Sequence, residues 1–153
     1  IRLGRAKSPV FTTEDSPFEI GRAEILRDGK DAVIIGCGML LHNAIVAAEE
    51  LAGENIDCMV INSHTVKPID EKIIIEAAQK TGAVVSVEEH QVNGGLGSAV
   101  AEVLSRNHPV PQEYIGVQDR FGESGDPKEL FKLFCLTADD IVKAAKKAMS
   151  RKK

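Results

Sequence analysis

Short apolar runs alternate along the chain with longer segments in which apolar residues recur every three or four positions. The runs have the composition of strands that a parallel sheet buries on both faces. They are AVIIG (32–36), DCMVINS (57–63), AVVSVEE (83–89) and YIGV (114–117). The segments between them have the spacing of amphipathic helices. This alternation predicts βαβ units and a parallel sheet covered on both faces.

Capping residues mark the ends of the predicted helices. Gly53 supplies a stop for the first helix, and Asp70 is placed to cap the second. Thr137, with Asp140 three residues later, resembles a capping box and opens the last helix. The predicted helices occupy residues 39–53, 71–82 and 96–104 and the segment after 137, with a further turn of helix within 122–134.

The first part of the chain has a different character. Residues 1–21 contain two prolines and a Thr/Glu/Asp/Ser cluster, which indicates an extended linker. Residues 18–26 have a strand-like pattern, and Asp28-Gly29 lies at the tip of a predicted turn. We expect this hairpin-like strand to join the sheet antiparallel at an edge. Because Ile1 starts the chain without a methionine, we expect the chain to be part of something longer.

The composition of the chain argues against several classes of function. The 153 residues suffice for one ordinary domain, and a net charge of -4 argues against a nucleic-acid or anionic-membrane surface. No apolar run has the roughly 20 residues of a membrane span, and no signal peptide is visible. Cys37, Cys58 and Cys135 are far apart and form no CxxC pair, so we expect buried, reduced thiols in a cytoplasmic protein.

Polar residues and glycines follow the predicted strands, where parallel sheets bind ligands. The glycine patterns do not match a dinucleotide fingerprint, because Leu41 and Val100 occupy the position of its third small residue. Backbone amides at residues 95–98 could hold an anion, but a tight strand-to-helix connection is the favoured explanation of these glycines. The strand ends carry residues 36–38, 63–65, 88–90 and 116–119.

The segment EEH (88–90) raises the question of acid/base chemistry. Consecutive strand residues point to opposite faces, so at most Glu88 and His90 share one. No nucleophile accompanies them, and we predict no catalytic residue in this chain. His64 and His108 lack partners at metal-ligand spacing, so we predict no metal site either. The charged turn at 119–126 is either a solvated loop or a loop ordered against another subunit.

Several spaced motifs resemble the C-terminal domain of transketolases. They are VVSVEEHQVNGGLGSAVAEVL, VQDRFGESGDPKELFKLFCLTADDIVKAAKKA, FEIGRAEILRDGKDAVIIGCGMLLHNAIVAAEEL and INSHTVKPID, all in the family's order. The resemblance implies a three-layer α/β/α fold with a five-stranded mixed, mostly parallel sheet whose first strand is antiparallel. It also implies that residues 1–17 end a preceding pyrimidine-binding domain and linker, and that 18–153 form the C-terminal domain.

The resemblance implies an activity that belongs to a larger assembly. The family transfers a two-carbon ketol unit between sugar phosphates, using thiamine diphosphate and magnesium, in a homodimer or a comparable split-subunit assembly. Its metal-binding G-D-G…N segment has only Gly125-Asp126-Pro127 as a counterpart here, and its activating glutamate lies in the absent middle domain. The implied partners are the remaining transketolase domains and a second subunit, and this chain alone should bind no cofactor and be inactive.

The resemblance also suggests site residues. Arg5, with Arg2 as second choice, aligns with an arginine that clamps the substrate phosphate, for which a guanidinium fork is suited. We expect Glu88, His90, Gly94 and Gly95 to lie near a domain or subunit interface. The alternatives are the same domain of 1-deoxyxylulose-5-phosphate synthases or of 2-oxoacid dehydrogenase β subunits, or a stand-alone interaction or ligand-binding module. The histidine in EEHQVNGGLG favours transketolase over the synthase.

Overall fold

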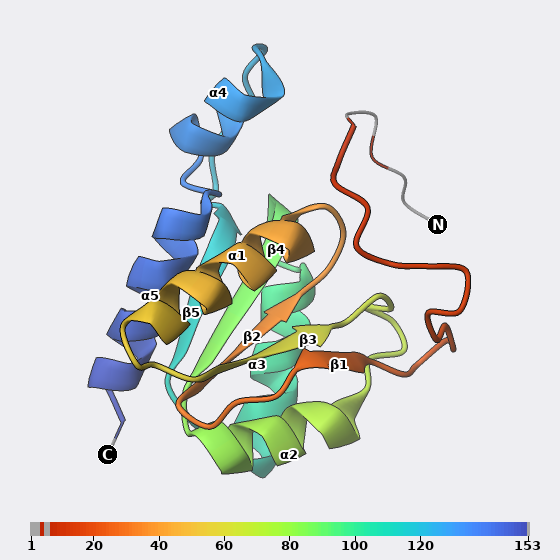
Figure 1. Cartoon of the computed structure of the whole chain (residues 1–153), viewed down its shortest axis with the longest axis vertical. Helices are drawn as coiled ribbons and strands as arrows, with labels where there is room; N and C mark the ends of the chain where they lie inside the picture. The colour runs from red at the N-terminus through yellow and green to blue at the C-terminus, as the bar shows by residue number, and fades with distance from the viewer. Residues whose placement is uncertain (1–3, 5–6, 153) are drawn as a thin grey trace.

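Strands and helices alternate through most of the chain, in a computed structural model that describes residue 4 and residues 7–152 (Figure 1). The elements are β1 (Glu24–Arg27), β2 (Ala32–Gly36), α1 (Leu40–Gly53), β3 (Cys58–Asn62), α2 (Glu71–Thr81), β4 (Val84–Gln91), α3 (Leu96–Asn107), β5 (Gln112–Val117), α4 (Pro127–Leu133) and α5 (Ala138–Ser150). No helix within these described residues is long and apolar enough to cross a membrane.

The five strands of the described chain form one sheet in the order β1-β3-β2-β4-β5. Strands β2, β3, β4 and β5 are parallel, and β1 pairs antiparallel with β3 at one edge. The mixed, mostly parallel sheet and its antiparallel first strand are therefore confirmed. The hairpin-like interpretation of β1 is wrong, because β3 lies between β1 and β2 and the turn joins strands that do not pair.

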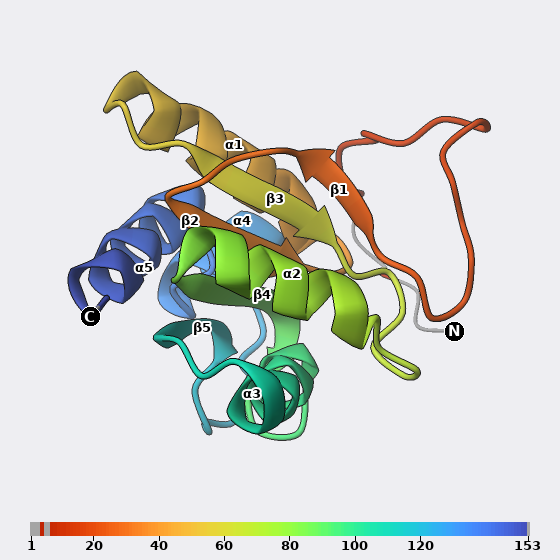
Figure 2. The same cartoon turned by 90° about the horizontal axis from the view of Figure 1, so that it is seen from below.

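Two layers of helices cover the sheet, as Figures 1 and 2 show. On one face Ile34 and Val60 pack in a core with α1 and α5. On the other face Val33 and Ile35 pack in a second core with α2 and α3. Because β2 is central and contributes to both cores, all five of its residues are buried. The predicted three-layer α/β/α architecture is confirmed.

The first strand is shorter than the predicted residues 18–26. The backbone amides of Gly21 and Ala23 donate to the side chains of Thr65 (3.0 Å) and Asp70 (3.0 Å). These bonds tie the segment before β1 to the loop after β3, so its amides do not enter the sheet ladder. The apolar pattern is typical of a strand, but hydrogen bonds to side chains of a distant loop determine the backbone conformation of this segment.

Most helix boundaries follow the predicted caps. Asp70 accepts a hydrogen bond from the amide of Ile73, and Thr137 and Asp140 form a capping box. The end of α1 differs in detail, because Gly53 is its last residue and the left-handed residue is Asn55, at φ 62°. The third helix runs three residues past its predicted end.

The cysteines are not all buried. Cys58 is buried, and desolvation raises the pKa of its thiol to about 11. Cys37 is half-buried, whereas Cys135 is exposed. The expectation of buried thiols is wrong for Cys135, because this residue follows α4 in a left-handed turn (φ 55°) outside both cores.

Candidate functional site

The corner at residues 88–98 extends beyond the carboxyl edge of the sheet. The pairing of β2 with β4 ends where Gly36 meets Val87, so the last four residues of β4 continue past β2. After an irregularity in the ladder, Gln91 pairs with Val117 of β5. The corner then turns directly into α3. Its position is that of a ligand site in a parallel sheet.

Glu88 occupies the inside of this corner. The residue is almost inaccessible, with 2% of its surface exposed. Its two carboxylate oxygens accept hydrogen bonds from the amides of Leu96 and Gly97, each at 2.8 Å. These amides belong to the first turn of α3, where backbone donors lack partners within the helix and the helix dipole favours a negative charge. The N-cap residue Gly95 has no side chain, so Glu88 caps the helix from the neighbouring strand.

The glycines of the corner leave room for this carboxylate. A Cβ on Gly95 would lie 2.0 Å from Oε2 of Glu88, and one on Gly97 would lie 2.6 Å from the ring of Tyr114. Gly94 is different, because it has open space around it but a φ of +79°. The favoured explanation, a tight strand-to-helix connection, therefore has a physical basis, and two of the amides considered for anion binding already bind Glu88.

His90 lies at the surface of the corner and on the same side as Glu88. Its Nδ1 is 2.7 Å from the carbonyl oxygen of Gln91 and 3.9 Å from Oε2 of Glu88. Sequence reasoning allowed these two side chains to share a face, and the distance confirms it. The buried carboxylate is engaged by α3, so the pair has the geometry of an oriented imidazole rather than of a free acid and base.

The string closest to a diphosphate-metal segment has a structural role. Oδ1 of Asp126 accepts a hydrogen bond from the amide of Lys128 at 2.9 Å and caps α4, with Pro127 at the first helical position. No group of three or more His, Cys, Asp or Glu within the described part of the chain could hold a metal ion. The described residues thus offer no such group of ligands for the magnesium that the family resemblance implies.

The turn at 119–126 extends from the corner toward α4. The side chain of Gln91 donates to Asp119 at 3.0 Å, which ties the end of β4 to this turn. Arg120 pairs with Glu123 and lies over the ring of Phe134, 4.7 Å from its centroid. Phe121, which lies between Arg120 and Glu123 in the sequence, is 96% exposed. The turn is therefore held by its own polar contacts while presenting an aromatic ring outward.

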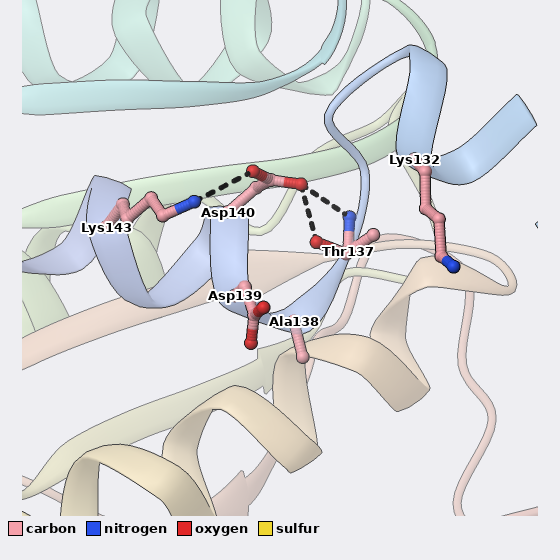
Figure 3. Close-up of a pocket in the computed structure, with 6 residues that line it drawn as sticks. All are labelled: Lys132, Thr137, Ala138, Asp139, Asp140 and Lys143. Atoms are coloured by element: carbon pink, nitrogen blue, oxygen red, sulfur yellow. Dashed lines mark hydrogen bonds and ion pairs between the residues drawn. The ribbon is translucent and has the colours of Figure 1, made fainter. Parts of the chain in front are cut away.

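Two open hollows lie on the surface. The larger, of about 490 Å³, is at the start of α5 (Figure 3), where Asp140 contacts Thr137 and Lys143. The second, of about 370 Å³, separates the loop after β3 from α3 and borders the corner at Gly94 and Gly95. Asp140 of the larger hollow is already engaged in its capping box, so this carboxylate has a structural role.

The remaining predicted residues have mixed outcomes. Glu88 is buried, whereas His90 and Gly94 are exposed. The interface assignment of this corner stays a prediction. Arg2 and Arg5, the predicted phosphate ligands, lie outside the described residues. The capping role of Glu88 was missed, and its only sequence signal was a glutamate eight residues before a helix whose N-cap position is glycine.

Known proteins resemble this chain over nearly its whole length. Residues 21–141 match the family model described as transketolase, C-terminal domain. The chain is 47% identical over 152 residues to the 6-deoxy-6-sulfo-D-fructose transketolase subunit SqwH of Clostridium sp. (strain MSTE9), across 99% of this chain and 47% of that protein. It is 38% identical over 146 residues to an apulose-4-phosphate transketolase subunit of Phocaeicola vulgatus, across 95% of this chain and 46% of that protein.

A solved structure is also similar. It is described as a split gene transketolase, inactive beta4 tetramer, and it superposes with a TM-score of 0.94 and 45% identity over 97% of this chain and 49% of that chain. The chain thus spans about half the length of these relatives. The chain is also similar to 1-deoxy-D-xylulose-5-phosphate synthases. It is 40% identical over 151 residues to that of Syntrophotalea carbinolica, across 97% of this chain and 24% of that protein.

Proposed function

This chain belongs to the transketolase C-terminal domain family, and on that premise we propose that it is the assembly domain of an enzyme that transfers a two-carbon ketol unit between sugar phosphates. The resemblance inferred from the sequence is thereby confirmed at the level of the family. In this proposal, thiamine diphosphate and magnesium are bound by the other parts of the enzyme. The chain alone is inactive.

The observation that carries the proposal is the engagement of Glu88. The corner carries Glu88, Glu89 and His90 at the carboxyl edge of the sheet, and the buried carboxylate of Glu88 is bound to the amides of Leu96 and Gly97. A carboxylate in this environment stabilises a helix start. The residues that the structure describes therefore support an assembly role better than a catalytic one.

The comparisons favour a split enzyme. The two relatives are each described as a transketolase subunit, and the similar structure is described as a split gene transketolase. We propose that residues 18–153 form the C-terminal domain of such a subunit in the cytoplasm and that 1–17 join it to a pyrimidine-binding domain. Arg5, or else Arg2, is proposed to contact the substrate phosphate, and the partners are the remaining domains and a second subunit.

The test is a titration of the chain with thiamine diphosphate and magnesium by calorimetry, alone and with the rest of the enzyme supplied as a separate polypeptide. We expect no heat from the chain alone, and both cofactor binding and ketol transfer from the mixture. Cofactor binding by the chain alone would contradict the proposal. The wild-type mixture is the reference, and a Glu102→Ala variant on the exposed face of α3 is the control.

One second function has support from the comparisons. The synthase match keeps 1-deoxyxylulose-5-phosphate formation as an alternative. The same mixture assayed for that product separates the two activities. Ketol transfer between sugar phosphates without the synthase product supports transketolase, whereas the reverse result assigns the domain to a synthase.

A further inference from the structure

We propose that His90 is a hydrogen-bond acceptor, through its Nε2 atom, for a cationic group on the part of the enzyme that binds thiamine diphosphate. The inference rests on the proposed function, because it needs a neighbouring domain or subunit. It goes further by assigning one atom, one type of contact and one type of partner group to the corner.

The contacts of Nδ1 determine the position of the imidazole proton. Nδ1 of His90 lies 2.7 Å from the carbonyl oxygen of Gln91, which can only accept a hydrogen bond. Nδ1 must therefore carry the hydrogen. Oε2 of Glu88, at 3.9 Å, favours the same arrangement. A neutral imidazole has only one ring proton, so Nε2 is left with an available lone pair.

The groups that face Nδ1 of His90 are held rigidly. Glu88 is fixed by two backbone amides of α3, and Gln91 is fixed by its pairing with Val117 and by its side-chain bond to Asp119. The two groups that face Nδ1 thus belong to ordered elements. Such support sets both the tautomer and the direction of a histidine ring, as the hydrogen-bond partners of metal-binding histidines do. An oriented acceptor loses less entropy on binding than a free one.

The side chain of His90 is accessible to a partner. The side chain of His90 is 48% exposed, and none of the described residues donates a hydrogen bond to Nε2. His64 is a useful contrast within the chain, because its Nε2 contacts the carbonyl oxygen of Glu19 and its ring packs against Phe18. The ring of His64 is therefore engaged within the chain, whereas Nε2 of His90 has no such contact among the described residues.

The surroundings of His90 indicate the identity of the donor. His90 lines neither of the two hollows described above, so the donor fits a protein surface better than a small molecule held in a cavity. Two carboxylates contact the segment that carries His90: Oε2 of Glu88 lies 3.9 Å from Nδ1 of His90, and Oδ1 of Asp119 accepts a hydrogen bond from the side chain of Gln91. The negative charge of these two carboxylates favours an arginine or lysine of the partner. The exposed ring of Phe121 on the adjoining turn adds an apolar contact.

The experiment compares His90→Ala, His90→Gln and His90→Lys in the chain mixed with the rest of the enzyme. Loss of a hydrogen bond to a charged group predicts about tenfold weaker association for His90→Ala. His90→Gln restores an acceptor oxygen and should recover association to within about threefold of wild type. His90→Lys, a cation without an acceptor, should weaken association most, and added salt should reduce its difference from His90→Ala. His108→Ala, at the opposite end of α3, is the control and should match wild type.

Nitrogen NMR of the isolated chain gives an independent readout, with a protonated Nδ1 and an unprotonated Nε2 expected at His90. The opposite tautomer would overturn the inference. So would wild-type association by His90→Ala, or a raised KM with unchanged association, which would assign the contact to substrate. If the wild-type polypeptides fail to associate at all, the proposed function falls together with the inference.

Discussion

The starts of α3 and α5 solve the same physical problem in two ways. Each exposes backbone amides that lack partners within the helix. At α5 the solution is local, because Thr137 and Asp140 form a capping box within one turn (Figure 3). At α3 the N-cap is Gly95, and Glu88 supplies the acceptors from the preceding strand. A local cap stabilises its own helix, whereas a remote cap also fixes the helix to the sheet.

The two caps also differ in burial. The side chain of Asp140 is 20% exposed, and that of Glu88 is 3% exposed. Water can replace part of a lost cap at α5. At α3, removal of the acceptor leaves buried amides without a partner, and the energetic cost of an unsatisfied buried group exceeds that of a lost exposed hydrogen bond. The remote cap should therefore be the more costly one to remove.

The largest expected effect belongs to Glu88→Ala. Two buried amides lose their acceptor, so we expect a loss of about 3 to 4 kcal/mol in the free energy of unfolding. Urea unfolding followed by circular dichroism measures it. Glu88→Gln keeps the shape and one acceptor oxygen and should fall between this variant and wild type.

A matched control for Glu88→Ala is available on α3 itself. Glu102→Ala removes an exposed carboxylate that pairs with Arg106 at 3.5 Å. Its loss should stay below about 0.5 kcal/mol. If Glu88→Ala cost no more than this control, the carboxylate would not be the effective cap of α3.

Gly95→Ala tests the close approach that the remote cap requires. Its new methyl group would meet Oε2 of Glu88, and we expect a loss of about 2 kcal/mol. In Gly94→Ala the new methyl group meets no atom, but the alanine must adopt a left-handed backbone conformation. We expect this to lower the free energy of unfolding by about 1 kcal/mol. Denaturant midpoints of both variants give the comparison.

A double-mutant cycle separates the clash from backbone strain. The cost of Gly95→Ala should fall in the Glu88→Ala background, because the carboxylate it contacts is absent there. The cost of Gly94→Ala should remain the same in both backgrounds. Equal costs of Gly95→Ala in both backgrounds would show that Glu88 is not what excludes a side chain at this position.

Thr137→Ala should cost less than Glu88→Ala or Gly95→Ala. The capping box loses the threonine oxygen, and typical caps contribute about 1 kcal/mol. Thermal unfolding of Thr137→Ala and Asp140→Ala measures this contribution. The double variant should cost less than the sum of the two single variants, because both remove the same box. Additive losses would argue that the two residues act separately.

The same contrast explains what the sequence could predict. The Thr137–Asp140 spacing is a local signal, so the start of α5 was predicted correctly. The buried runs of β2 and β4 predicted the parallel sheet for the same reason. The role of Glu88 depends on where a strand places one side chain relative to the next helix, and β1 was shortened by Thr65 and Asp70, which lie more than forty residues away. Contacts of this kind have no spacing rule.

The smallest effect is expected at the C-terminal end of α5. Like the start of α3, this end is bound to a residue of another element, but here the contact lies at the surface. Burial acts to raise the pKa of Glu113, but hydrogen bonds from Lys147 and Arg151 outweigh it and lower the pKa below the ordinary 4.5. A lowered folded-state pKa means that this stabilisation is present above pH 4.5 and is lost as the pH falls through the folded-state value. Glu113→Gln should therefore cost about 0.5 kcal/mol at neutral pH and nothing in acid. Urea unfolding at a series of pH values measures the difference, and a cost that did not shrink on acidification would show that packing, not charge, holds this end of the helix.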